Sequence, residues 1–111
     1  MAYSRYKVIY SPAAYKDLDA IVLYIVTHFK DKRAAKSLAD EIRIKIKSLS
    51  DMPERYALVD WEPWASMNIH RFPVRNYVVF YSVNHDRKLV TVVRIFYSGQ
   101  DIENIIKEFD R

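Results

Sequence analysis

Hydrophobic positions divide the chain into a helical first half and a strand-rich second half. Between residues 11 and 50, apolar residues recur every three or four positions, which is the period of an amphipathic helix. Between residues 69 and 98, they fall in short runs rich in β-branched and aromatic side chains, which is typical of strands. The pattern predicts an α+β domain in the order β-α-α-loop-β-β-β-α.

Two helices are predicted in the first half. After a short strand at residues 6–10, Ser11 can act as an N-cap and Pro12 fits the first helical position. Charged residues 30–33 separate the two helices, and a link this short favours an antiparallel hairpin on one face of the sheet. The predicted inward positions are Ala14, Leu18, Ile21, Val22, Ile25 and Phe29 in the first helix, and Ala35, Leu38, Ala39, Ile42, Ile46 and Leu49 in the second.

Three strands joined by two turns are predicted for residues 69–98, as a mainly antiparallel sheet. Residues 77–83 are almost continuously apolar or aromatic and form the central strand. Residues 84–88 have hairpin-loop composition, and Arg75-Asn76 can make a tighter turn before the central strand. Residues 100–106 predict a short C-terminal helix. Because the helical hairpin covers one sheet face, the other face must be covered by another segment or serve as a working surface.

The segment at residues 54–68 has no steady period and carries Trp61, Pro63 and Trp64. We interpret it as a loop over the edge of the core. The two tryptophans are expected to plug the core, with contact to a partner as the alternative.

Composition narrows the class of protein. The chain of 111 residues fits one domain, residues 1–111, and its single glycine and 50% hydrophobic content argue against disorder. The absence of cysteine excludes a disulfide scaffold and a thiolate zinc site, the three histidines lack metal-ligand spacing, and Gly99 alone makes no phosphate loop. We therefore expect no cofactor and no metal. No apolar run approaches the roughly 20 residues of a membrane span, so a soluble, cytoplasmic protein without a membrane partner is predicted.

Charge is unevenly distributed along the chain. Residues 30–50 and residues 69–98 each have a net charge of +4, whereas residues 51–68 have a net charge of −3. A separated positive surface suits a polyanion such as nucleic acid, and ordinary solubilising charge is the alternative. Residues that could contact nucleic acid are Arg43, Lys47, Arg71, Arg75, Tyr81 and Arg94.

Strand alternation limits which of these side chains can act together. In the last strand, Val90, Val92, Arg94 and Phe96 form one set, so that Arg94 is either ion-paired or a site residue. Tyr97 belongs to the opposite set. His70 and Arg71 should also point to opposite faces, which favours a core position for His70 if Arg71 faces a ligand. Tyr77 and Tyr81 lie on the same face of the central strand. The alternative to a functional role is that both are core residues.

The segments YKVIYSPAAYKDLDAIVLYI, HRFPVRNYVVFYSVN and VTVVRIFYSGQDIENII, with the Met52-Pro53 break, resemble the RelE/ParE toxins of bacterial type II toxin–antitoxin systems. The resemblance covers nearly the whole chain in the right order. It implies the fold described above and a cognate antitoxin as partner, encoded by an adjacent small gene. RelE-like toxins cut mRNA on the ribosome without a metal, whereas ParE-like toxins inhibit DNA gyrase.

The resemblance transfers incompletely to individual residues. Arg71 matches a basic position on the first sheet strand, but Val78 stands where nucleases commonly have arginine, with Arg75 as a possible substitute. The usual basic pair after the last strand is replaced by Ser98-Gly99-Gln100, and the terminal catalytic tyrosine has no clear match. The residues implied for catalysis are Arg71, Arg75, Arg94 and Tyr97.

These observations lead to three hypotheses. The first is a ribosome-dependent, metal-independent mRNA endonuclease that inhibits growth and is neutralised by its antitoxin. The second is a gyrase-binding toxin without nuclease activity, and the third is a nucleic-acid-binding protein that is no longer toxic.

Overall fold

The computed structural model describes residues 5–109 and has the predicted α+β order. Its elements are β1 (Lys7–Tyr10), α1 (Pro12–Phe29), α2 (Lys32–Lys47), the 3-10 turn η1 (Ser48–Ser50), β2 (His70–Val74), β3 (Tyr77–Asn84), β4 (Leu89–Tyr97) and α3 (Ile102–Phe109). The predicted fold class is therefore confirmed. None of the helices in this described part has the length and apolar character needed to cross a bilayer.

The four strands form one sheet in the order β1-β4-β3-β2. β1 runs parallel to β4, whereas β2, β3 and β4 are antiparallel neighbours. β1 is short and pairs only with the first part of β4, ending at the pair Tyr10↔Val92. Beyond Val92, one edge of β4 therefore has no neighbouring strand.

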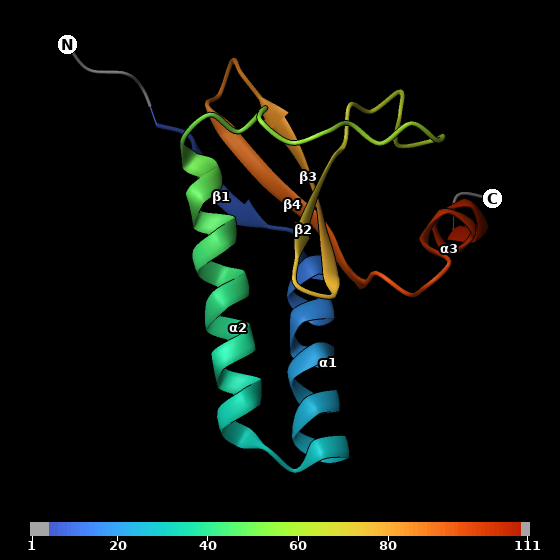
Figure 1. Cartoon of the computed structure of the whole chain (residues 1–111). Coiled ribbons are helices and arrows are strands. Elements are labelled where there is room, and N and C mark those ends of the chain that lie inside the picture. The colour runs from blue at the N-terminus through green and yellow to red at the C-terminus, as the bar shows by residue number, and fades with distance from the viewer. Residues whose placement is uncertain (1–4, 110–111) are drawn as a thin grey trace.

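The helical hairpin packs on one face of the sheet (Figure 1). Ser11 Oγ accepts a hydrogen bond from Ala14 N at 3.0 Å, and Asp31 Oδ1 accepts one from Ala34 N at 2.9 Å, so both helices have the N-caps their sequences favour. The closed end of the hairpin extends beyond the sheet (Figure 1). For this reason Phe29, which was predicted to point inward, is 67% exposed.

Two cores lie on opposite faces of the sheet. The core under the hairpin joins Leu38, Ile42 and Ile46 of α2 to Val79 and Tyr81 of β3. All five predicted inward residues that lie within α2 are buried. The second core joins Val78 and Phe80 to Trp64 of the loop and to isoleucines of α3. Trp64 is only 6% exposed, so the predicted plug is confirmed for Trp64, whereas Trp61 is half-buried against the same core. The second sheet face is therefore covered.

A β-bulge at Val93 changes the phase of β4. Phe80 pairs with Arg94 while Tyr81 pairs with Val92, which leaves Val93 without an opposite residue in β3. Val92 and Ile95 consequently share the hairpin face, and Phe96 joins the second core. The predicted alternation, in which Val92, Arg94 and Phe96 share a face, is wrong beyond Val92 because a strict period of two does not survive a bulge.

Candidate functional site

A concave site lies between the closed end of the hairpin and the strand ends around the Arg75-Asn76 turn. This hairpin cleft has a volume of about 860 Å³. Its helical wall is largely apolar and aromatic, and its strand wall brings arginine, tyrosine and amide side chains. The residues that line it include Asp17, Tyr24, Phe29, Arg75, Tyr77, Arg94, Tyr97 and Gln100.

Arg94 is bound to Asp17 of α1. Arg94 Nε lies 2.8 Å from Asp17 Oδ2 and Arg94 Nη2 lies 3.0 Å from Oδ1, so the guanidinium and carboxylate pair through two hydrogen bonds. The Arg94 Cζ atom also lies 4.5 Å from the centre of the Phe96 ring. Arg94 was expected to be either ion-paired or a site residue, and in this structure it is ion-paired. That Arg94 also binds a ligand stays a prediction.

Side chains close the edge of β4 that β1 leaves open. Asp17 Oδ2 also accepts a hydrogen bond from Ile95 N at 2.8 Å. Ser11 Oγ donates to the Val93 carbonyl oxygen at 2.9 Å, and Gln100 Oε1 accepts from Tyr97 N at 3.1 Å. These contacts occupy backbone groups that would otherwise be available to another strand.

Arg75 forms the second ion pair at this cleft. Its Nε atom lies 2.7 Å from Oε1 of Glu41 on α2, and both side chains are partly exposed. Arg75 has a φ of 53°, in the left-handed region that disfavours a residue with a Cβ atom. The pair with Glu41 therefore connects a strained turn to the hairpin.

Tyr97 and Tyr77 stand at the mouth of the cleft. Their ring centres are 5.9 Å apart in a T-shaped arrangement, and Tyr97 is 51% exposed. Gly99 allows this arrangement, since a Cβ atom at that position would lie 2.5 Å from Cε2 of Tyr97. Burial raises the pKa of Tyr77 and the neighbouring tyrosines add to the effect, so Tyr77 is not prepared to act as a base near neutral pH.

Arg71 lies outside the cleft. It is exposed on β2 and stands across from Phe80, on the sheet face opposite the hairpin. The four residues predicted for catalysis therefore do not meet: Arg75, Arg94 and Tyr97 line one cleft, and Arg71 is on the other side of the sheet. Arg43 and Lys47 are exposed on α2 and are not among the residues lining this cleft.

His70 and Tyr81 belong to the core. His70 is 7% exposed, donates from Nδ1 to the Tyr56 carbonyl oxygen at 2.8 Å, and stacks on Tyr81. Tyr81 is fully buried and donates its hydroxyl to the Pro53 carbonyl oxygen at 2.6 Å; burial raises its pKa. The prediction that Tyr81 contacts nucleic acid is wrong, because its ring fills the space between sheet and hairpin. The core alternative for both residues is correct.

Asp17 and Glu41 are the site residues that the sequence interpretation missed. Each immediately precedes an inward apolar residue of its helix, Leu18 or Ile42. A carboxylate that borders an apolar stripe is costly without a partner, and this position was the available signal. Among residues 5–109, no cluster of three or more His, Asp or Glu side chains could hold a metal ion.

Several solved structures with a similar fold are chains of toxin–antitoxin systems. A chain of the chromosomal ParDE system from P. aeruginosa matches with a TM-score of 0.68 and 19% identity, covering 84% of this chain and 96% of that one. A chain of the RelBE2 toxin–antitoxin complex from Mycobacterium tuberculosis matches with a TM-score of 0.61 and 15% identity, covering 89% and 98%. A chain of the archaeal RelE–RelB complex from Pyrococcus horikoshii matches with a TM-score of 0.58 and 18% identity, covering 86% of this chain and 98% of that one. At these identities the likeness establishes the fold alone.

No curated protein sequence is matched by this chain. A family model does match, over residues 8–102, and its description is the ParE toxin of the type II toxin–antitoxin system parDE. The matched residues run from the second residue of β1 to the first residue of α3 and include both helices of the hairpin. The chain therefore belongs to the ParE toxin family of type II toxin–antitoxin systems.

Proposed function

We propose that this toxin arrests growth by binding DNA gyrase and that it does not cut mRNA. The observation that carries the proposal is the neutralisation of both cleft arginines: Asp17 pairs with Arg94, and Glu41 pairs with Arg75. A binding function tolerates such pairs, whereas phosphate chemistry needs positive charge directed at the ligand.

The chemistry of RNA cleavage sets further demands. It requires a base for the 2′-hydroxyl, cations for the developing charge on phosphate, and an acid for the leaving oxygen. His70 is buried against Tyr56 and Tyr81, and Arg71 lies on the other face of the sheet. Among the described residues, Tyr97 is the one predicted catalytic residue that is exposed at the cleft and takes no part in an ion pair. This arrangement supports the gyrase alternative of the sequence analysis, as does the ParE description of the matching family.

The ribosome-dependent mRNA endonuclease is the second candidate. It is favoured by one observation, namely that Arg75, Arg94 and Tyr97 line the same cleft with Tyr77 beside them. For that cleft to cut RNA, the two arginines must exchange their carboxylates for phosphate oxygens when the message binds.

Two assays distinguish the candidates. In the first, the toxin is added to gyrase and supercoiled plasmid with ATP, and cleaved DNA is counted after protein denaturation. In the second, it is added to programmed ribosomes, and primer extension maps cuts in the message. We expect cleaved DNA–gyrase complexes and an intact message, and the cognate antitoxin should abolish the effect. Cuts in the ribosomal A-site codon with no effect on gyrase would overturn the proposal.

A further inference from the structure

The positive charge of the protein is concentrated on α2. This helix carries six basic and two acidic residues, whereas α1 carries one lysine and two aspartates. The net charge of α2 is +4, equal to that of the whole chain, so the rest of the molecule is balanced. Ordinary solubilising charge mixes both signs over the surface, and α2 departs from that pattern.

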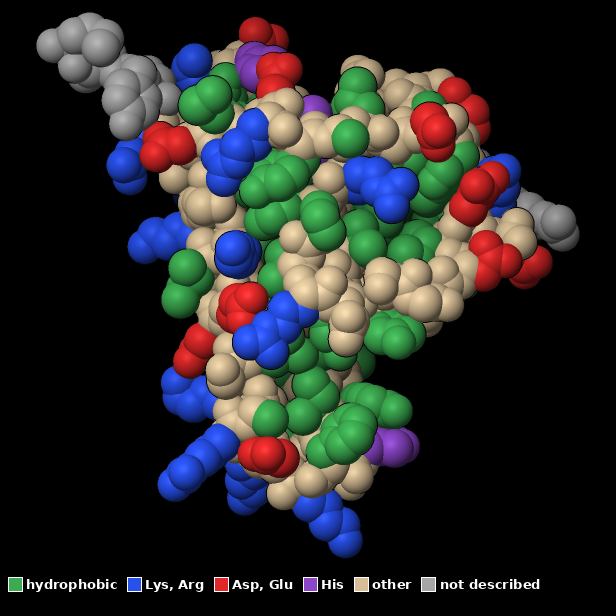
Figure 2. All heavy atoms as spheres, viewed as in Figure 1, with side chains coloured by type: hydrophobic (Ala, Val, Ile, Leu, Met, Phe, Trp, Pro, Cys, Tyr) green, Lys and Arg blue, Asp and Glu red, His purple; other side chains and the backbone are tan. Residues whose placement is uncertain are grey.

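Four of the basic residues form a row along one flank of α2. All four are exposed: Lys32, Lys36, Arg43 and Lys47. Together with Asp40, which lies between Lys36 and Arg43, they are spaced three or four residues apart and so lie on one side of the helix. We call these four basic residues the α2 ridge. At 1.5 Å per residue the ridge is about 22 Å long, with basic groups along its whole length. Figure 2 shows the basic side chains along this edge of the molecule.

Asp40 holds two ridge side chains in place. Lys36 Nζ lies 2.7 Å from Asp40 Oδ2 and Arg43 Nη1 lies 3.7 Å from Oδ1. The hydrogen bond from Lys36 lowers the pKa of Asp40, so this carboxylate is charged at neutral pH. It is the one acidic residue in the row, and it lowers the positive potential there without removing it.

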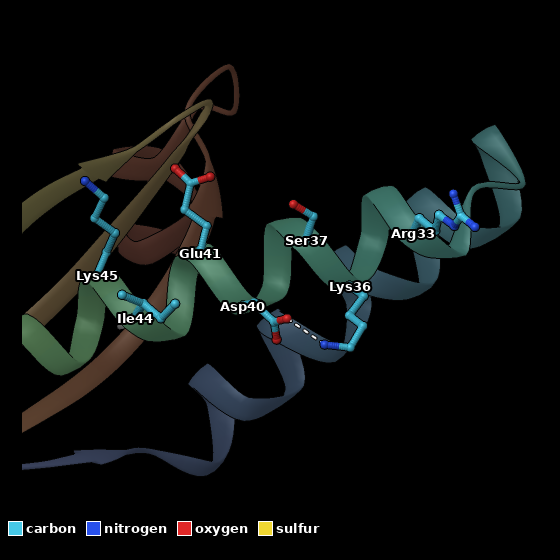
Figure 3. Close-up of a pocket in the computed structure, with 7 residues that line it drawn as sticks. All are labelled: Arg33, Lys36, Ser37, Asp40, Glu41, Ile44 and Lys45. Atoms are coloured by element: carbon cyan, nitrogen blue, oxygen red, sulfur yellow. Dashed lines mark hydrogen bonds and ion pairs between the residues drawn. The ribbon is translucent and has the colours of Figure 1, made fainter.

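The ridge is separate from the hairpin cleft. Figure 3 shows Lys36 and Asp40 directed to one side of α2, and Glu41 and Lys45 directed to the other side. Glu41 is the residue that binds Arg75 at the cleft. A ligand on the ridge would therefore leave the cleft free for a protein partner.

The composition and shape of the ridge limit the ligand. Its four side chains are all basic, and the exposed Ile44 of α2 adds only one apolar side chain beside Asp40, too little area for an amphipathic helix or a lipid surface to bury. Single-stranded nucleic acid is held by aromatic side chains that stack on successive bases, and the ridge has none. A straight, convex row of cations instead complements the regularly spaced phosphates of a duplex. We propose that the α2 ridge binds the phosphate backbone of duplex DNA.

The test is the salt dependence of DNA binding, measured by fluorescence anisotropy with a labelled 20-base-pair duplex. Four phosphate contacts give a slope of about −3.6 in log K against log salt, so affinity should fall about 150-fold between 50 and 200 mM salt. Lys32→Gln/Lys47→Gln removes two contacts and should reduce the fall to about 12-fold. Neither lysine has an ion-pair partner among the described residues, so the fold should be unaffected, which far-UV circular dichroism verifies.

A matched control keeps the total charge equal. Lys45→Gln/Arg87→Gln removes two exposed cations, one from the other flank of α2 and one from the β3–β4 turn. This variant should retain the wild-type slope, while Asp40→Asn should tighten binding because it removes the one negative charge in the row. Equal losses in both double variants would assign DNA binding to net charge and overturn the proposal.

Two other results would also overturn it: tighter binding of single-stranded RNA of the same length, or weakened binding of the cognate antitoxin by the ridge variant with unchanged DNA binding. The proposal does not depend on the gyrase hypothesis. The anisotropy assay contains DNA alone and the cleavage assay contains gyrase, so each can fail without the other.

Discussion

Substituting Asp17 tests whether the Arg94 ion pair is a structural bond of the β4 edge. The Asp17 carboxylate accepts hydrogen bonds from Arg94 Nε at 2.8 Å, Arg94 Nη2 at 3.0 Å and Ile95 N at 2.8 Å. The side chains of Arg94 and Asp17 are only 25% and 14% exposed. Asp17→Ala therefore leaves a guanidinium and a backbone amide without their partner in a poorly hydrated place.

The expected loss of stability follows from that burial. Breaking a fully buried pair costs about 3–5 kcal/mol, and the remaining exposure of Arg94 places this pair at the low end, about 3 kcal/mol. For a domain of this size the melting temperature should fall by about 12 °C. Arg94→Ala should cost less, about 2 kcal/mol, because Asp17 keeps its hydrogen bond from Ile95 N.

Urea unfolding followed by circular dichroism measures these values. A double-mutant cycle of Asp17→Ala and Arg94→Ala should give a coupling free energy of about 1–2 kcal/mol. The exposed pair of Lys36 and Asp40 is the matched control, and its loss should leave the urea unfolding midpoint close to that of the wild type, because solvent screens an exposed ion pair. If Asp17→Ala unfolds like the wild type and the coupling is zero, the reasoning fails, and Arg94 is free to meet a phosphate. Loss of toxicity in Arg94→Ala with full toxicity in Asp17→Ala would likewise assign Arg94 to the site.

Three further changes probe the cores and the mouth of the cleft. Burial raises the pKa of Tyr81 above its unfolded value, so the unfolded chain releases this proton first and stability falls above about pH 10, by up to about 1.4 kcal/mol per pH unit; Tyr81→Phe should flatten this alkaline decline in urea titrations, and an unchanged slope would contradict it. Trp64→Ala should cost about 3–5 kcal/mol in urea unfolding, clearly more than Trp61→Ala, because Trp64 is buried between Phe80 and the loop. Gly99→Ala should displace the ring of Tyr97 with a loss below about 1 kcal/mol, since the clash involves a half-exposed side chain; an unchanged Tyr97 ring signal in NMR would refute this.

Local signals in the sequence were sufficient for the hairpin. Ser11-Pro12 starts α1 where cap chemistry predicts, and α2 buries its apolar stripe as its period requires. Trp64 could be placed in a core from its amphipathic ring and the irregular loop around it. These features depend on residues a few positions apart, so a single sequence contains the information.

The candidate site depends on long-range geometry that the pattern does not contain. Arg94 and Asp17 are 77 residues apart in the chain, and their pairing requires both the bulge at Val93 and the early end of β1. Alternation correctly separated His70 from Arg71, because β2 has no bulge. It misplaced Arg94 relative to Val92, because one inserted residue moves all later side chains of β4 to the other face.

The short first strand links the architecture to the proposed activities. Because β1 ends at Tyr10, the backbone groups in the later part of β4 need hydrogen-bond partners other than a strand. The Asp17 carboxylate accepts hydrogen bonds from both Ile95 N and the Arg94 guanidinium. The same bond that closes the sheet edge therefore neutralises a cation that RNA cleavage would require. Glu41 has the corresponding effect on Arg75, while the basic residues of the α2 ridge outnumber their one carboxylate. Positive charge is thus available on the outer flank of the hairpin and compensated inside the cleft, which is the distribution expected of a toxin that holds DNA on one surface and a protein on another.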